Sequence, residues 1–269
     1  MKNHYDAIVI GGGVNGGSVA YQLAKRGKRV LLLEKDRIAS KASSAAAGML
    51  AAQAELNEAS PLFLLAKNSR EMFSDIAKEI KELTNIDIEL INKGMLKVAL
   101  NEEEVQEYQR IIETHREVGE QAEWLDLDEV KRCEPYVSNH VLGAMYIEKD
   151  GHVSAPHLTL GFVKAAAILG ATIKEFVEVK SLLLNGKNVS GVSTNEGNYY
   201  SENVIVTAGA WSNNILNKIG LNIEGYPVKG ECFSVLTNQP LLTSTIFSHG
   251  GNLRQTLQAH DVKTYLDTN

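Results

Sequence analysis

The chain has 269 residues, which is enough for a sizeable hydrophobic core and for one or two domains. Its composition, 44% hydrophobic and 22% charged, is typical of a globular protein, and its net charge of −6 excludes the basic surface that nucleic acids or anionic membranes require. Cys133 and Cys232 lack metal-binding spacing, and no segment approaches the ~20 apolar residues of a membrane span. We therefore expect a cytoplasmic protein without a metal.

The N-terminal stretch predicts a dinucleotide-binding βαβ unit. An apolar run at 7–10 precedes Gly11, Gly13 and Gly16, and a second apolar run ends at Glu34. In such a unit the glycines allow a tight turn, close approach of a pyrophosphate and close helix packing. The helix N-terminus offers N–H groups to the diphosphate, and the carboxylate can accept hydrogen bonds from a ribose. The ligand implied by these residues is FAD or NAD.

A tract of small residues follows at 41–53 and includes Ser43 and Ser44. One interpretation is a backbone that passes closely along a large flat ligand. The other is an alanine-rich helix start with Ser44 as its cap. The residues by themselves leave both interpretations open.

The middle of the chain predicts alternating helices and strands. Helical spacing of apolar residues or capping signals predict helices, and short apolar runs predict strands. In chain order we expect a core-facing amphipathic helix over 61–83, a strand over 94–100, a helix over 101–118, a short helix over 128–132, a strand over 142–147 and a helix over 156–169. His152 and His157 have no partners at metal-ligand spacing, so we interpret both as surface or core residues.

Three β-rich runs at 171–184, 189–194 and 199–206 are separated by asparagine–glycine signals and predict a meander. The last run enters a second glycine turn at 207–212, followed by a helix from about 211 to 219. Open α/β sheets bind ligands where a strand ends in such a turn. The two turns together indicate one dinucleotide held between two strand ends.

Five features follow one another along the chain: the βαβ unit ending at Glu34, the 43–49 tract, the strand with Gly94, the 207–212 turn and the 227–232 segment. In this order they resemble the D-amino-acid oxidase superfamily of FAD-dependent oxidoreductases, most closely its bacterial glycine oxidases, over about residues 1–249. The resemblance implies an interleaved α/β fold. Its Rossmann-like FAD-binding domain comprises 1–84 and 150–225, an incomplete antiparallel-sheet substrate domain comprises 85–149 and 226–249, and 250–269 forms a non-matching tail.

The resemblance implies FAD as the cofactor and assigns its contacts residue by residue. Besides the three glycines, those facing the diphosphate are Val14, Asn15, Ala42, Ser43 and Ser44. Those facing the adenosine, the second turn or the isoalloxazine are Glu34, Lys35, Val179, Ala208, Gly209, Ala47, Gly48 and Met49. Met49 and Phe247 are implied to contact substrate.

The implied chemistry is oxidative deamination of glycine or a small amine, with oxygen as co-substrate, in thiamine biosynthesis. Hydride moves from the α-carbon to the flavin, the imine hydrolyses to glyoxylate and ammonia, and hydrogen peroxide is released. No general base is obligatory, so the catalytic residues are unknown. The resemblance also implies that full-length relatives are homo-oligomers.

The C-terminal stretch departs from the family. An arginine normally clamps the substrate carboxylate, but Arg254 is the only arginine after Arg132, and its surroundings do not match. Asn252 stands where a second active-site aromatic is expected. The abrupt change after about His249 indicates premature termination, so we expect weak FAD binding and little or no oxidase activity.

Three alternatives remain. The same fold can oxidise sarcosine, another secondary amine or a D-amino acid. The chain can instead be a non-catalytic FAD-binding fragment. An NAD-dependent dehydrogenase is disfavoured by the 47–49 segment and by the meander.

Overall fold

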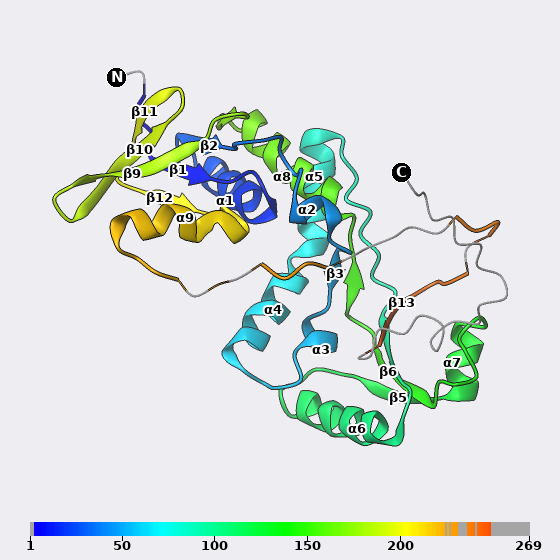
Figure 1. Cartoon of the computed structure of the whole chain (residues 1–269). Helices are drawn as coiled ribbons and strands as arrows, with labels where there is room; N and C mark the ends of the chain where they lie inside the picture. The colour runs from blue at the N-terminus through cyan, green and yellow to red at the C-terminus, as the bar shows by residue number, and fades with distance from the viewer. Residues whose placement is uncertain (1–2, 224, 226, 231–235, 240, 249–269) are drawn as a thin grey trace. The chain divides into compact units, whose positions relative to one another are not determined.

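The computed structural model describes residues 3–223, 225, 227–230, 236–239 and 241–248. The chain divides into two compact units (Figure 1). The first unit comprises 1–47, 75–89 and 154–232, and the second comprises 48–74, 90–153 and 233–269. The segment 48–74 therefore belongs to the second unit, although its predicted place is the FAD-binding domain. The division into cofactor and substrate domains stays a prediction.

The first unit contains a parallel sheet with the strand order β12-β1-β2-β8. Its strands are β1 (Ala7–Ile10), β2 (Val30–Leu33), β8 (Thr172–Lys174) and β12 (Val204–Val206). All four residues of β1 and of β2 are buried, as continuous apolar strands covered on both faces should be. Helices α1 (Val14–Lys25) and α8 (Ala155–Ile168) pack together at Tyr21 and Phe162, whose ring centroids lie 5.6 Å apart. This sheet confirms the expected Rossmann-like architecture.

The predicted meander is also present in the first unit, formed by β9 (Val179–Asn185), β10 (Asn188–Thr194) and β11 (Gly197–Tyr200) in antiparallel order. The 171–184 run divides, because β8 pairs in parallel with β2 and only the later residues join the meander. The helix expected after the second glycine turn divides likewise, into the 3₁₀ turns η1 (Gly209–Trp211) and η2 (Asn217–Ile219) on either side of α9 (Ser212–Leu216).

The second unit is built on a four-stranded sheet with the order β13-β4-β6-β5. Its strands are β4 (Met95–Ala99), β5 (Glu123–Asp126), β6 (Gly143–Ile147) and β13 (Thr245–Ser248). The pairs β4–β6 and β5–β6 are antiparallel, as expected, but β13 pairs with β4 in parallel, so the sheet is mixed.

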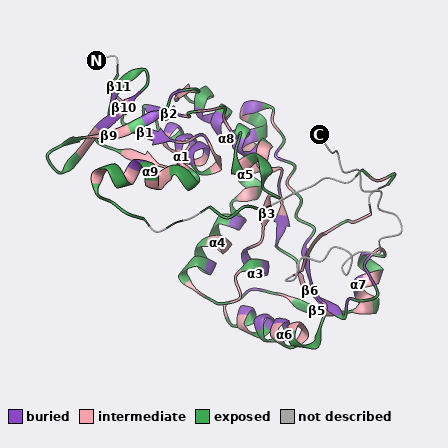
Figure 2. Ribbon diagram, viewed as in Figure 1, coloured by how far each residue is buried: buried purple, intermediate pink, exposed green. Residues whose placement is uncertain are grey.

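Side chains alternate between the two faces of this sheet, and each face carries its own core. Figure 2 shows that α6, in the same unit, carries both buried and exposed residues. Met95 and Met145 lie on the face that packs against α6 (Glu102–Glu117), whereas Leu96 and Val98 lie on the face that packs with Val130 of α7 (Leu127–Cys133). Both helices have a side-chain N-cap. The Asn101 side chain accepts a backbone N–H of α6, and the Asp126 side chain accepts one of α7.

The remaining helices correct two expectations. The helix expected over 61–83 is two helices, α4 (Pro61–Glu71) and α5 (Phe73–Thr84), and the apolar Leu64, Leu65 and Met72 are exposed rather than core-facing. The short elements of the small-residue tract are α2 (Ala42–Ala45), β3 (Met49–Leu50) and α3 (Ala52–Glu55), with β3 paired to β7 (Gly151–His152). Ser44 lies inside α2 and is not its cap. In the described part of the chain, no helix has the length and apolar character needed to cross a membrane.

Candidate cofactor-binding site

The two glycine turns of the first unit lie against each other. Gly11 has φ +110°, and a Cβ built on it would lie 2.5 Å from the carbonyl oxygen of Thr207 in the second turn. A Cβ on Gly16 would lie 1.9 Å from the Gly11 oxygen and 2.8 Å from the Thr207 hydroxyl. Both positions therefore require glycine, because the first turn, the start of α1 and the second turn approach with no room for a side chain.

The N-terminus of α1 is arranged to bind an anion. Its cap residue, Gly13, supplies no side-chain acceptor, and the Val14 amide donates to the Ser43 hydroxyl oxygen at 2.9 Å. Among the described residues, the amides of Asn15 and Gly16 have no hydrogen-bond acceptor. Unpaired N–H groups at the positive end of a 12-residue helix are the donors that a diphosphate accepts. This donor set fits the diphosphate of FAD.

Glu34 follows β2 and is held by the backbone on both sides. Its Oε2 accepts the Gly12 amide at 2.7 Å, and its Oε1 accepts the Asp36 amide at 2.8 Å. A carboxylate oxygen has further lone pairs beyond one such bond, so both oxygens can still accept ribose hydroxyls. The neighbouring Lys35 is exposed, and its Nζ lies 4.2 Å from the ring centroid of Trp211 at the second turn. The expected adenosine-facing pair thus lies beside both glycine turns.

The other expected cofactor residues divide between the two units. Those in the first unit are Ala42, Ser43, Ser44, Ala47, Val179, Ala208 and Gly209. Ala42 and Ala47 are exposed, Val179 is buried at the start of β9, and Gly209 has φ +55°. Gly48 lies in the second unit, together with both expected substrate residues, Met49 and Phe247.

Within the second unit, Met49 and Phe247 border the same hydrophobic cluster, which contains Ala54, Met95 and Met145. Met49 reaches this cluster from β3, and Phe247 reaches it from β13. The structure therefore groups the two expected substrate residues around one core. Arg254 and Asn252 lie outside the described residues.

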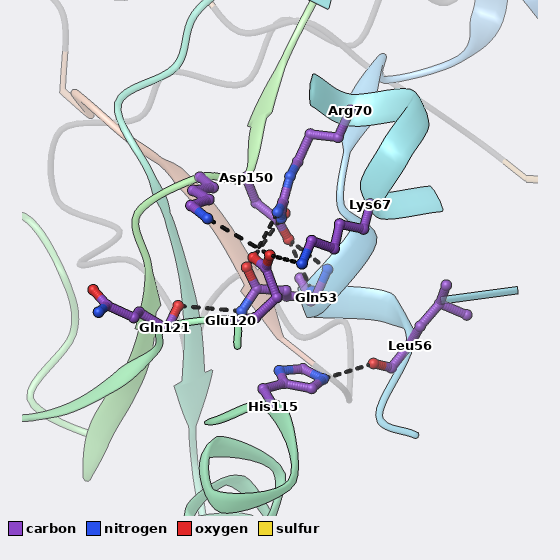
Figure 3. A network of polar contacts seen from close by, with 10 residues as sticks. Gln53, Leu56, Lys67, Arg70, His115, Glu120, Gln121 and Asp150 are labelled. Atoms are coloured by element: carbon purple, nitrogen blue, oxygen red, sulfur yellow. Dashed lines mark hydrogen bonds and ion pairs between the residues drawn. The ribbon is translucent and has the colours of Figure 1, made fainter. Parts of the chain in front are cut away.

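A buried polar network fixes the segment that follows Met49 (Figure 3). The Asp150 Oδ2 accepts the backbone amides of Gln53 and Ala54 at 3.0 and 2.9 Å. The Arg70 guanidinium donates to Asp150, to Gln53 Oε1 at 3.0 Å and to Glu120 Oε2 at 2.7 Å. Both carboxylate side chains have zero exposure. One arginine thus joins three separate segments of the second unit.

Burial and charge act in opposite directions on the two carboxyl groups. Burial raises the pKa of Asp150, and the Arg70 guanidinium and the Ala54 amide offset that rise only in part. Burial also disfavours ionised Glu120, but hydrogen bonds from Lys67 and Arg70 outweigh it and hold the pKa of Glu120 below its usual value. Lys67 and Arg70 therefore favour the ionised form of Glu120.

Three residues that shape these segments were not predicted from the sequence: Thr207, Arg70 and Asp150. Arg70 had a signal, because it follows Phe63 by two helical turns and both are the buried residues of α4. Within the described ranges, no group of three or more His, Cys, Asp or Glu side chains is arranged to hold a metal ion. Cys133 is an exposed free thiol, and Cys232 lies outside those ranges.

Comparison with known proteins identifies the family of this site. Residues 6–261 match the DAO family model, described as FAD dependent oxidoreductase. The chain belongs to this family. The DAO match extends past residue 249, into the segment 250–269 that was predicted to be a non-matching tail.

Glycine oxidases are among the DAO-family relatives most similar to this chain. The protein from Geobacillus kaustophilus is 41% identical over 252 residues, which cover 93% of this chain and 67% of the relative, and that from Bacillus subtilis is 36% identical over 92% and 65%. The crystal structure of the Geobacillus kaustophilus enzyme superposes with a TM-score of 0.89, again covering 93% of this chain and 67% of the relative. That of the Bacillus cereus glycine oxidase, 42% identical, superposes with 0.85 over 91% and 66%. The chain thus spans about two thirds of the length of these relatives.

Proposed function

We propose that the chain binds FAD through the N-terminus of α1 and the Glu34 carboxylate. The observation that carries this proposal is the contact between the two glycine turns, where a Cβ on Gly11 would lie 2.5 Å from the Thr207 oxygen. Beside it, the amides of Asn15 and Gly16 have no acceptor among the described residues, and the Glu34 carboxylate is held by two amides. The family match supports FAD over NAD.

We further propose that the reaction is oxidation of a small amino acid or amine, with glycine as the first candidate substrate. When bound, FAD supplies the acceptor for a hydride and, through oxygen, the source of hydrogen peroxide. The chain's own contribution is positional. The α1 amides hold the diphosphate, Glu34 holds the ribose, and Met49 and Phe247 provide apolar walls that orient the α-carbon and exclude water.

The glycine oxidase relatives support glycine as the substrate. A secondary amine is the second candidate, supported by the 4-methylaminobutanoate oxidase of Paenarthrobacter nicotinovorans, which is 29% identical over 228 residues. The proposed role in thiamine biosynthesis has weaker support, from the bifunctional protein ThiO/ThiG of a Synechocystis strain at 27% identity.

The test is reconstitution of the purified chain with FAD, followed by flavin fluorescence and peroxide assays with glycine, sarcosine and D-alanine. We expect FAD to bind weakly, and more weakly still after Glu34→Ala, whereas the exposed control Glu202→Ala leaves the affinity unchanged. We expect little peroxide, because Arg254, the only arginine after Arg132, does not stand in the family's arginine pattern.

Each part of the proposal can fail separately. If no FAD binds even at a large excess of FAD over the chain, the cofactor assignment is overturned. Peroxide from sarcosine or D-alanine but not from glycine overturns the substrate. One tightly bound flavin per chain with rapid glycine turnover refutes the expected weakness.

A further inference from the structure

In the second unit, the backbone of His152 lies between two neighbouring segments, and its amide and carbonyl both bond to one of them, at Ile91. It is the antiparallel partner of Met49 in the β3–β7 pair. On its other side it exchanges two backbone hydrogen bonds with Ile91, at 2.9 and 3.0 Å. The backbone of His152 therefore has little freedom, and the position from which its side chain extends is fixed.

The imidazole of His152 reaches a third segment. Its Nδ1 lies 2.7 Å from the hydroxyl oxygen of Thr245, the first residue of β13. Both residues are only partly buried. The contact is within hydrogen-bond distance whichever of the two atoms donates. Among the described residues, Nε2 has no hydrogen-bond partner.

This hydrogen bond joins the two strands that carry the expected substrate residues. Met49 lies directly opposite His152, and Phe247 lies two residues after Thr245 and hence on the same face of β13. Both border one hydrophobic cluster. Asp150 stiffens the same corner, since it immediately precedes β7 and holds the amides of Gln53 and Ala54.

We propose that the His152–Thr245 hydrogen bond sets the spacing between Met49 and Phe247, and through it the size of amine that the site accepts. The selectivity part rests on the proposed function, whereas the spacing part does not. His152 and Thr245 are positioning residues, because they act through the strands on either side. The expectation that His152 is only a surface or core residue is the competing interpretation.

Matched substitutions separate the hydrogen bond from the residue. In His152→Asn the side-chain amide places a polar atom near the position of Nδ1, whereas in His152→Gln it reaches toward the position of Nε2. Thr245→Ser keeps the hydroxyl, and Thr245→Val replaces it with a methyl group of similar size. We expect His152→Gln and Thr245→Val to break the contact and the other two variants to keep it.

The first measurement uses ¹³C-labelled methionine methyl groups and needs no turnover. The chain has five methionines, so the Met49 resonance can be assigned by its loss in Met49→Leu. We expect this resonance to shift in His152→Gln and Thr245→Val and to return in the conservative variants. Met72, which is exposed and lies outside the cluster that Met49 and Phe247 border, serves as the internal control. A Met49 resonance unmoved in both disruptive variants, or moved equally in all four, overturns the proposal.

The second measurement titrates the FAD-supplemented chain with glycine and with sarcosine while the Met49 methyl is observed. We expect the ratio of the two dissociation constants to change by at least about threefold in the disruptive variants and to be restored in the conservative ones. An unchanged ratio overturns the selectivity role. Failure of the proposed function is distinguishable, because it is seen as missing flavin binding and missing peroxide in the unmodified chain, with the methyl shifts still readable.

Discussion

Replacement of Arg70 by methionine tests the buried network most directly. The Arg70 side chain is 5% exposed, and the side chains of its two carboxylate partners, Asp150 and Glu120, are not exposed at all. Removal of one member of a buried ion pair costs about 3–5 kcal/mol, because the remaining charge stays buried without compensation. Lys67 remains 2.9 Å from Glu120, so the loss falls mainly on Asp150. We therefore expect destabilisation of about 3 kcal/mol.

The assay is urea unfolding of Arg70→Met in a Trp211→Phe background, where Trp124 of β5 alone reports on the second unit. The matched control is Arg132→Met. Arg132 is 74% exposed and lies 3.9 Å from Glu129, so its loss should cost less than about 0.5 kcal/mol. A second change, Asp150→Asn, should recover part of the stability lost in Arg70→Met, because it removes the uncompensated charge. A cost below about 1 kcal/mol for Arg70→Met, or no recovery, refutes the reasoning.

Two further predictions concern the first turn and a buried histidine. Gly16→Ala should destabilise the first unit by about 1–3 kcal/mol in urea unfolding and should weaken FAD binding. The control Gly230→Ala, where no atom of the described residues lies within 4 Å of the added Cβ, should change neither. Equal effects of the two changes would contradict the steric argument. Burial lowers the pKa of His115, so the unfolded chain binds the extra proton first and stability should fall as pH drops below about 6.5, by up to about 1.4 kcal/mol per pH unit. His115→Gln should remove that slope, and an identical pH profile in both proteins would exclude His115 as its source.

The parts of the fold that were predictable from sequence are those fixed by local chemistry. The glycines at 11, 13 and 16 predicted the βαβ unit, and at 11 and 16 only glycine fits the turn. Asn101 predicted the start of α6, because its side chain accepts the Glu104 amide. The predictions that failed concern parts of the fold whose structure depends on distant partners. The helical pattern of 61–83 continues through Met72, yet the structure has two helices that meet there. Within the first of them, Leu64 is exposed and Arg70 is buried.

The candidate site was predictable to a similar degree. The position of Glu34 at the end of an apolar run was sufficient to place it beside the first turn. The parallel pairing of β13 with β4 had no local signal, because the partners of Thr245 and Phe247 lie about 150 residues earlier. For the same reason, the link from His152 to Thr245 was not visible in the sequence.

The contact between the two glycine turns has a consequence for biosynthesis. The first turn lies at the start of the chain, but its neighbour Thr207 follows almost 200 residues later, and β1 pairs with β12 across the same interval. Domains generally form as their residues emerge from the ribosome, and contacts between distant residues form slowly. A nascent chain therefore carries the complete glycine motif of the βαβ unit long before the proposed cofactor site can form. If FAD binds as proposed, it can favour the folded form only after β12 has joined β1, and it would then stabilise a late step in folding rather than template an early one.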